Sequence, residues 1–414
     1  MPRCGSRPAE AGMARDPVAL VHAFNAGREP ERLALKYRAM AKDAFAFMRG
    51  SCHLFYQDYV AAGLGIDAPT AWICGDLHLE NFGSCVGRDR RLHFDMNDFG
   101  EALLAPASWE LSRFLVSLRV AADNLDIDTA QAGMLSRTFL DAYAAALSGD
   151  MAHAMDADRA DGMVRDLLHK ARARDKADFI DARTHKRNGR LLLHLDGKRA
   201  LPPQAADRER VAALLEAHAA TRSDARCFEL LDCARRIAGT GSLGIERHVL
   251  LVRGNPSGDD EGPSLLDLRH EPGSALMAYV RQAQPAWTSQ AARVVTAQRR
   301  MQASPPDLLE ALVLGERSYV LKELLPSQDS LELTDWNGKP ARLEAVMRAM
   351  GATLAGAQLR SAGTPGCAAR AELVEFGARM PDMQGRLFEH AEGYARQVDR
   401  DWRAFTDAHP VGGQ

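Results

Sequence analysis

Two short apolar segments that each lead directly into acidic residues constrain the fold of this chain most. The segments "TAWICGD" (70–76) and "RLHFDMND" (91–98) have the composition of short strands, and "SCVGRDR" (84–90) supplies turn residues between them. The pattern therefore predicts two strands, each followed by an acidic loop. The candidate site residues in these loops are Asp76, His78, Glu80, Asn81, Asp95 and Asp98.

Helical periodicity surrounds these strands, and a β-rich stretch interrupts it later in the chain. Apolar residues recur at helical spacing over 31–62, 106–125 and 132–147. The stretch "CARRIAGTGSLGIERHVLLVRGN" (233–255) has the pattern of strand, glycine loop and strand. With the strand-like residues and one helix that follow, it predicts a sheet of about five strands. Earlier, Asp196-Gly197 lies between short apolar runs and predicts a hairpin turn.

These patterns together predict an α+β fold with a mostly helical lobe and a smaller antiparallel-sheet lobe. The chain divides into a mobile leader (1–26), a helical catalytic lobe with the acidic motifs (27–225), a β-rich glycine-loop lobe (226–330) and C-terminal helices that pack on the helical lobe (331–414).

Charge and cysteine usage exclude several classes of protein. A formal net charge of -3 argues against a nucleic-acid-binding protein, which normally carries a strong basic excess. The seven cysteines are odd in number and form no CxxC pair, which argues against a disulfide framework or a zinc site. No apolar run reaches the roughly 18 residues of a membrane span. We therefore expect a cytoplasmic protein without nucleic-acid or membrane partners.

The acidic motifs suit phosphoryl transfer from a magnesium nucleotide. Asp76 can accept the proton of a substrate hydroxyl group, while the side-chain oxygens of Asn81, Asp95 and Asp98 can hold Mg²⁺ against the phosphates. Magnesium requires hard oxygen ligands of this kind.

The loop "GTGSLG" has the spacing of a phosphate-binding glycine loop, through Gly239, Gly241 and Gly244, with Ser242 between them. A dinucleotide-binding loop of this pattern opens a helix, whereas here the following "IERHVLLVRG" alternates as a strand does, which places the loop in a hairpin. Its glycines let backbone N–H groups approach the phosphates of ATP. The alternative is a tight structural hairpin without a ligand.

Four motifs in this order carry a resemblance to known families. "CGDLHLENF" resembles the H-G-D-x-H-x-x-N catalytic loop of aminoglycoside and choline kinase-like phosphotransferases, and "HFDMNDFGE" resembles their metal-binding segment. With "PASWELSRF" and "GTGSLG", they resemble bacterial domain-of-unknown-function family 2252, which is grouped with the protein-kinase-like fold. The resemblance implies a catalytic base at Asp76, metal ligands at Asn81 and Asp95, and ATP on the glycine loop. Because the glycine loop follows the catalytic loop, it also implies a circular permutation.

The sequence departs from the kinase pattern at identifiable positions. Cys74 stands where the phosphotransferase motif has histidine, so loop bracing must come from elsewhere, with His78 as a candidate. Arg269 stands where a phosphate-binding lysine is expected, and Lys322 is the second candidate cation or a solvent-facing strand lysine. No acidic residue occurs between Gly273 and Pro306 to orient that cation. Glu110 either braces the catalytic loop or pairs with Arg113 at i, i+3.

The sequence therefore predicts an ATP- and Mg²⁺-dependent phosphotransferase that acts on a hydroxyl group of an unidentified small molecule, and a protein substrate stays open. One alternative is a catalytically silent nucleotide-binding or regulatory module. Another is a metal-dependent phosphoesterase built around Asp76 and His78, although the sequence lacks the Asn-His pair that such a site needs downstream.

Overall fold

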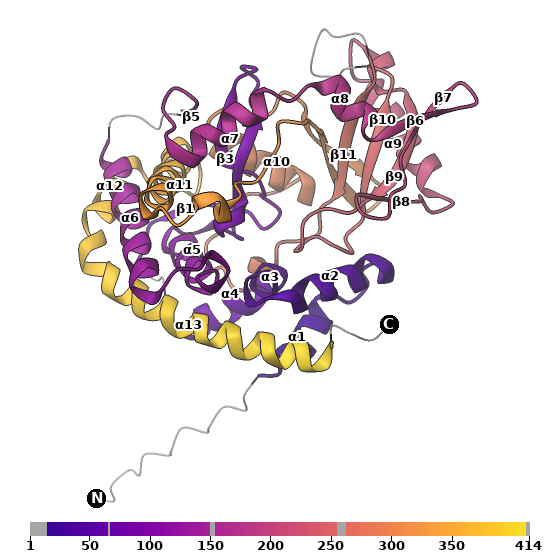
Figure 1. Cartoon of the computed structure of the whole chain (residues 1–414). Helices are drawn as coiled ribbons and strands as arrows, with labels where there is room; N and C mark the ends of the chain where they lie inside the picture. Colours follow the sequence, from indigo (N-terminus) through magenta and orange to yellow (C-terminus); the bar gives the residue numbers. More distant parts are fainter. Residues whose placement is uncertain (1–14, 65–66, 150–153, 255–261, 411–414) are drawn as a thin grey trace, which may run out of the picture.

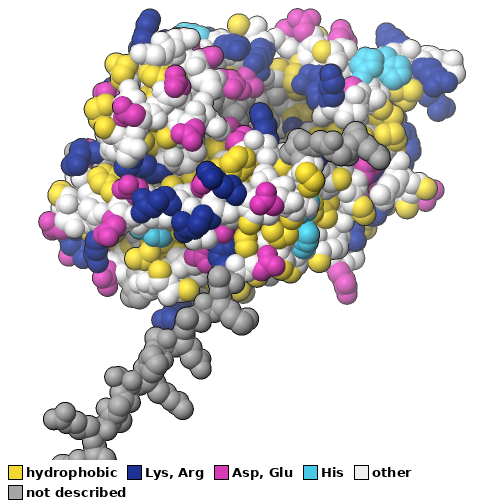
Figure 2. Space-filling view, turned by 60° about the horizontal axis from the view of Figure 1, so that its bottom comes forward, with side chains coloured by type: hydrophobic (Ala, Val, Ile, Leu, Met, Phe, Trp, Pro, Cys, Tyr) yellow, Lys and Arg dark blue, Asp and Glu magenta, His cyan; other side chains and the backbone are white. Residues whose placement is uncertain are grey.

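The computed structural model describes residues 15–64, 67–149, 154–254 and 262–410. Over these residues the protein has an α+β fold, as predicted, with most helices gathered in one part and a large antiparallel sheet in another (Figure 1). None of the described helices is long and apolar enough to cross a membrane. Basic and acidic side chains are interspersed over the face shown in Figure 2.

In the helical part, two long helices pack closely against each other. The helices of this part are α1 (Pro17–Phe24), α2 (Pro30–Lys42), α3 (Ala44–Gly50), α4 (Cys52–Ala61), α5 (Ser108–Val120), α6 (Thr129–Ser148), α7 (Gly162–Arg172), α11 (Pro340–Ser361), α12 (Arg370–Ala378) and α13 (Met380–Ala408). Helices α6 and α11 meet at Gly351, where a Cβ would lie 2.4 Å from the Phe139 carbonyl oxygen, so the contact requires glycine. Helix α13 runs along the outside against α5 (Figure 1).

Helix α1 lies within the segment predicted to be a mobile leader, so that prediction is wrong for residues 17–24. The Asp16 carboxylate caps the helix by accepting hydrogen bonds from the backbone N–H groups of Val18 and Ala19, at 2.9 and 3.1 Å. The preceding Arg15 forms ion pairs with Asp58 at 2.5 Å and Asp401 at 2.6 Å. These contacts fix the segment to α4 and α13. Residues 1–14 of the predicted leader lie outside the described residues.

Short antiparallel strands carry the acidic loops, as the sequence predicts. Strand β1 (Thr70–Ile73) pairs with β4 (Leu103–Pro106), and β3 (Leu92–Met96) pairs with β2 (Phe82–Val86) and β5 (Met155–Asp156). The loop after β1 contains Asp76, and the loop after β3 contains Asp98. Single turns of 3₁₀ helix connect several elements: η1 (Leu79–Asn81), η2 (Asp123–Leu125), η3 (Ala225–Phe228), η4 (Ala275–Ala278) and η5 (Leu333–Trp336).

The large sheet of the described residues has six strands in the order β12-β13-β11-β10-β9-β8, and all neighbours are antiparallel. The glycine loop joins β9 to β10, as predicted, and the short β8 is a strand that the sequence did not indicate. The elements are β8 (Ala200–Leu201), β9 (Leu230–Arg236), β10 (Arg247–Val252), β11 (Ser264–His270), β12 (Leu309–Leu314) and β13 (Arg317–Glu323), with α10 (Gln290–Met301) between β11 and β12.

The two faces of this sheet have different partners. On β11, Leu266 and Leu268 belong to an apolar cluster with helix α9 (Asp207–Ala219), whereas Leu265 packs with Ile180 of α8 (Lys176–Asp181) on the other face. Since side chains alternate along a strand, Asp267 and Arg269 share the face of Leu265. This parity places the charged end of β11 on the face opposite α9.

The hairpin in the segment before the sheet turns at a different dipeptide from the one predicted. Strands β6 (Thr184–Arg187) and β7 (Arg190–Leu193) are joined by Asn188-Gly189, both with positive φ (51° and 75°). A two-residue turn with two positive φ angles is the preferred hairpin connection, and Asn-Gly is its strongest signal. Asp196-Gly197 instead forms a local turn in which Asp196 accepts hydrogen bonds from backbone N–H groups.

Candidate active site

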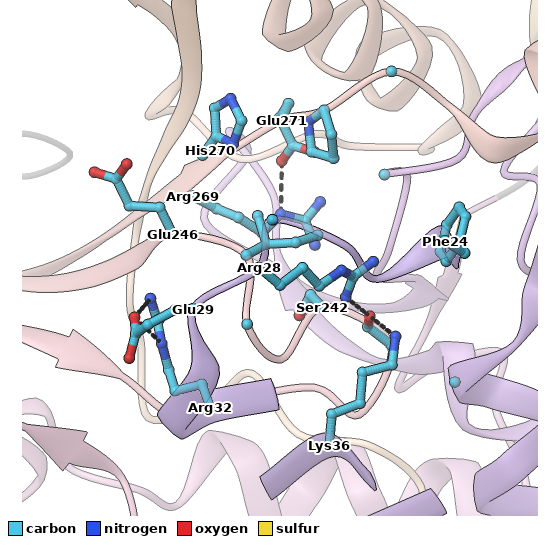
Figure 3. A pocket seen from close by; sticks show the side chains of 18 of the residues that line it. Phe24, Arg28, Glu29, Arg32, Lys36, Ser242, Glu246, Arg269, His270 and Glu271 are labelled. Atoms are coloured by element: carbon cyan, nitrogen blue, oxygen red, sulfur yellow. Dashed lines mark hydrogen bonds and ion pairs between the residues drawn. The ribbon is translucent and has the colours of Figure 1, made fainter. Parts of the chain in front are cut away.

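A cleft of about 800 Å³ lies between the acidic loops, the glycine loop and helix α2 (Figure 3). It brings together candidate residues that are far apart in the sequence. Four of the predicted site residues, all of them in the described part of the chain, do not line it: His78, Asn81, Asp95 and Gly239. The predicted site residues that do line it are Asp76, Asp98, Gly241, Ser242, Gly244 and Arg269.

Asp76 is held by a buried arginine of helix α5. Arg113 donates from Nε at 2.8 Å and from Nη2 at 2.5 Å to Oδ1 of Asp76. Arg113 is fully buried, whereas 21% of the Asp76 side chain is exposed. The other carboxylate oxygen, Oδ2, lies 4.0 Å from the position that a Cβ on Gly241 would occupy. One oxygen is therefore fixed by the guanidinium, and the other faces the glycine loop.

Glu110 braces the loop that leads to Asp76. Its Oε1 accepts hydrogen bonds from the backbone N–H groups of Cys74 at 2.6 Å and Gly75 at 3.4 Å, and Gln358 donates to Oε2 at 3.3 Å. Burial raises the pKa of Glu110 to about 7. Since Arg113 is directed to Asp76, the alternative of a Glu110–Arg113 pair is wrong. The loop support expected from a histidine at position 74 comes from Glu110.

Asn81 ties the two acidic loops together. Its Nδ2 donates to the carbonyl oxygens of Asp76 at 3.1 Å and Asp98 at 3.3 Å, and its Oδ1 accepts from the N–H groups of Asn97 at 3.2 Å and Asp98 at 2.8 Å. An amide oxygen has two lone pairs, and both are used here. For Asn81 to act as the predicted metal ligand, these backbone contacts would have to rearrange.

Asp95 lies away from the cleft. It is 1% exposed, and its two oxygens accept hydrogen bonds from the N–H groups of Met96 at 2.8 Å and Ala303 at 2.9 Å. Burial raises the pKa of this carboxyl, against the charge of the neighbouring Arg360. In this arrangement Asp95 anchors the segment after α10, and the carboxylate that reaches the cleft from this motif is Asp98.

Asp98 meets the sheet through an arginine on β11. Its Oδ1 lies 3.0 Å from Nη1 of Arg269 and accepts a hydrogen bond from the N–H of Gly100 at 3.1 Å. Nε of Arg269 also donates to Glu271 at 2.6 Å. Glu271 is 3% exposed and follows β11 directly. The carboxylate that orients this cation therefore lies two residues along the same segment, and not on the helix after the strand, where the kinase pattern would place it.

The glycine loop is held against the acidic loop by residues of the N-terminal helices. A Cβ on Gly241 would lie 3.2 Å from the carbonyl oxygen of Arg49, so little space exists for a side chain at this position. Gly239 and Gly244 have φ of +70° and +86°, which favour glycine. Ser242 donates to the Ala238 carbonyl at 3.1 Å within the loop. The carbonyl of Gly241 accepts hydrogen bonds from Arg28 and Lys36 (Figure 3).

His78 has a local structural contact. Its Nδ1 accepts a hydrogen bond from the N–H of Glu80 at 3.2 Å, and its ring packs edge-on against Phe45. Burial, with the charge of Arg49, lowers the pKa of His78 to about 3, so the ring is neutral near pH 7. Within the described parts of the chain, no cluster of three or more His, Cys, Asp or Glu side chains could hold a metal. A two-metal phosphoesterase centre has no ligand set there.

A charged network that the sequence patterns did not predict lies on the same sheet face as Arg269. Asp267 is 1% exposed and accepts from Arg247 at 2.5 and 2.8 Å and from Arg236 at 2.8 Å. Lys322 lies opposite Asp267 in the strand register and is half-buried, and burial lowers its pKa to about 8. The prediction that the Lys322 side chain faces solvent is therefore wrong. The signal for this network was the alternation of charges on adjacent predicted strands.

A smaller cavity of about 200 Å³ continues from this network. Apolar side chains line part of it, among them Val249 of β10 and Leu324 just after β13. Polar and charged side chains line the rest: Arg183, His194, Asp196, Arg199, Arg236 and Gln328. It lies on the sheet face that carries Asp267 and Arg269.

Comparison with known proteins gives one family and no closer relative. A family described as uncharacterized protein conserved in bacteria (DUF2252) matches residues 28–408. No curated protein and no solved structure matches the chain.

Proposed function

The chain belongs to this family of uncharacterized bacterial proteins, and from that premise we propose that it is a phosphotransferase that moves the γ-phosphoryl group of ATP to a hydroxyl group of a small molecule. One observation carries the proposal: Asp76, Asp98, Arg269 and the glycine loop reach one cleft from distant parts of the sequence. A base, a metal-binding carboxylate, a phosphate-binding cation and a glycine loop are the parts that kinase-type phosphoryl transfer uses.

We further propose a permuted protein-kinase-like fold. In kinases a glycine loop is followed by a strand that carries a cation and then by a helix. The same order occurs here, with the glycine loop between β9 and β10, Arg269 on β11 and α10 after it. The acidic loops, which follow this unit in kinases, precede it in this chain. Glu271 supplies the carboxylate partner of the strand cation without help from α10.

The residues present fit a magnesium nucleotide through a small protein ligand set. Magnesium is usually held by one or two carboxylates together with substrate phosphates and water. The Asp98 side chain, 54% exposed, is available for this role, whereas Asn81 and Asp95 are engaged with backbone groups. Bound Mg²⁺ would neutralise charge on the transferred phosphate. The cavity beside Val249 and Leu324, at about 200 Å³, is large enough for a nucleobase and partly apolar, and Arg236, Arg247 and Lys322 lie on the same sheet face as Arg269.

In the transfer step, the hydroxyl oxygen of the acceptor forms a bond to the γ-phosphorus while the bond from that phosphorus to the bridging oxygen of ADP breaks. The hydroxyl proton passes to Oδ2 of Asp76, which faces the glycine loop. Arg113 fixes the orientation of Asp76 by donating two hydrogen bonds to Oδ1. Arg269 and the glycine loop orient the phosphates.

A catalytically silent nucleotide-binding module is the second candidate. It is favoured by the engagement of Asn81 and Asp95, which leaves Asp98 as the one predicted metal ligand that lines the cleft. The two candidates differ in turnover and agree on nucleotide binding.

Thermal unfolding with ATP and Mg²⁺, followed by an assay of ADP release, tests the proposal. A ligand that binds only the native state raises the midpoint of unfolding. We expect a rise for the wild type with ATP and Mg²⁺, and loss of its magnesium-dependent part in Asp98→Asn. The matched control is Asp166→Asn, an aspartate of α7 that is 65% exposed and ion-paired with Arg342. An unchanged unfolding midpoint at millimolar ATP and Mg²⁺ would contradict nucleotide binding. A raised midpoint, with no ADP released in the presence of any acceptor tested, would favour the silent module.

A further inference from the structure

Two basic residues of the N-terminal helical segment, which precede all the predicted motifs in the sequence, also line the cleft. Lys36 lies on α2, and Arg28 lies in the link between α1 and α2. Nζ of Lys36 and Nη1 of Arg28 each donate to the carbonyl oxygen of Gly241 at 2.9 Å, and Arg28 also donates to the Leu243 carbonyl at 3.0 Å. Figure 3 shows the ends of the two side chains meeting at this loop. Their nitrogen donors therefore gather at one point of the cleft.

These two cations differ from the other basic side chains that line the cleft. Within the described parts of the chain, neither Lys36 nor Arg28 forms an ion pair with a carboxylate. By contrast, each of the six other arginines that line the cleft has such a partner: Arg32 pairs with Glu29, Arg49 with Glu80, Arg210 with Asp207 and Glu246, Arg235 with Glu29 and Glu31, Arg269 with Asp98 and Glu271, and Arg317 with Glu246.

Burial makes this lack of a counterion costly. Lys36 is 0% exposed, and one acceptor satisfies only one of its three N–H donors. A buried charge without an ionic partner is unfavourable unless a ligand compensates it. The nearest acids do not fill the role, because Asp76 is bound by Arg113 and Glu101 accepts from the N–H of Ala275 at 2.6 Å. Burial also lowers the pKa of Lys36 well below its usual range, as expected for a site without its anion.

The two cations lie near Asp76, where the proposed function places the acceptor hydroxyl. Gly241, whose carbonyl they share, is the glycine-loop residue next to Oδ2 of Asp76, with 4.0 Å between that oxygen and the position of a Cβ. The cations Arg236, Arg247 and Lys322 lie instead on the sheet face that continues to the second cavity. An acceptor hydroxyl at Asp76 would therefore have Lys36 and Arg28 beside it.

We propose that Lys36 and Arg28 form a subsite for an anionic group, a phosphate or a carboxylate, on the acceptor molecule. The acceptor is then an anionic hydroxyl compound. This inference rests on the proposed function, since it assigns the anion to the molecule that is phosphorylated. The same chemistry could be met by a phosphate of the nucleotide, and the experiment separates the two sources.

Inorganic phosphate is the probe for this subsite. In the nucleotide-free full-length protein, millimolar phosphate should raise the midpoint of thermal unfolding. Lys36→Met keeps the length of the side chain and removes its charge, and it should weaken phosphate binding at least tenfold. Arg28→Gln, at a half-buried position, should weaken it severalfold and guards against a folding defect specific to position 36. Arg317→Gln is the matched control, because Arg317 lines the same cleft but is paired and 59% exposed.

The response of Lys36→Met to ATP and Mg²⁺ identifies the source of the anion. If nucleotide stabilisation changes less than twofold while phosphate binding is lost, the acceptor assignment is supported. Equal loss of both would assign the cations to the nucleotide and overturn it. Undiminished phosphate binding in both variants would also overturn the subsite. If the wild type binds phosphate through Lys36 but does not bind ATP at all, the proposed function fails while the anion site stands.

Discussion

Glu110 should make the stability of this protein fall as pH rises through neutrality. The carboxyl is buried beneath the loop that leads to Asp76, and its pKa is raised from 4.5 to about 7. A raised carboxyl pKa contributes stability that is fully present below the unfolded-state value and is lost as pH rises through the folded-state value. At about 1.36 kcal/mol per pKa unit, the protein should lose roughly 2–3 kcal/mol of unfolding free energy from this group between pH 5 and 8.

Glu110→Gln removes this titration while keeping an oxygen for the N–H groups of Cys74 and Gly75. Urea unfolding of the wild type and of Glu110→Gln at pH 5, 6, 7 and 8 measures the effect as the difference between their free energies of unfolding. That difference should move by roughly 2–3 kcal/mol in favour of the variant across the range. Glu375→Gln, on the exposed face of α12, should show no such trend. Parallel pH profiles for the wild type and Glu110→Gln would refute a buried, titrating Glu110.

The remaining predictions concern the residues around Asp76. Asp76→Ala should lower turnover by about two to four orders of magnitude in an ADP-release assay while ATP affinity stays within a few-fold, and equal turnover would reject a base at this position. Gly75→Ala should lower the free energy of unfolding by about 2 kcal/mol or more in urea titrations, because φ is +85° and a Cβ would lie 2.5 Å from the Glu101 carbonyl; a neutral result would contradict the local geometry. Glu271→Gln should weaken the binding of ATP with Mg²⁺ by about 1–3 kcal/mol in calorimetry by releasing Arg269, and unchanged affinity would separate this pair from nucleotide binding.

The features that the sequence predicts well are those with a local pattern. Strands β1 and β3 and the glycine hairpin were predicted because alternation, turn residues and φ-permissive glycines act within a few residues. The sequence cannot decide which of Asp95 and Asp98 enters the cleft, because that depends on Ala303, a residue two hundred positions away that donates to Asp95. The kinase pattern places the acidic partner of Arg269 on the following helix, whereas Glu271 lies only two residues after Arg269 in the sequence. The place of Lys36 in the cleft could not be predicted from the sequence, because a lysine in a polar helix is normally exposed.

The side-chain amide of Asn81 links the two acidic motifs. Since its amide holds the carbonyl oxygens of both Asp76 and Asp98 and accepts from the N–H of Asp98, the two loops are fixed relative to each other before any ligand arrives. Arg113 then fixes Asp76 from the helical side, and Arg269 fixes Asp98 from the sheet side. Glu101 and Arg293 also join the Asp98 loop to the segment directly after β11, through Ala275 and Pro272, so the position of Arg269 and the Asp76–Asp98 geometry are fixed together. Under the proposed function, the base that the acceptor hydroxyl meets is therefore positioned before the nucleotide binds.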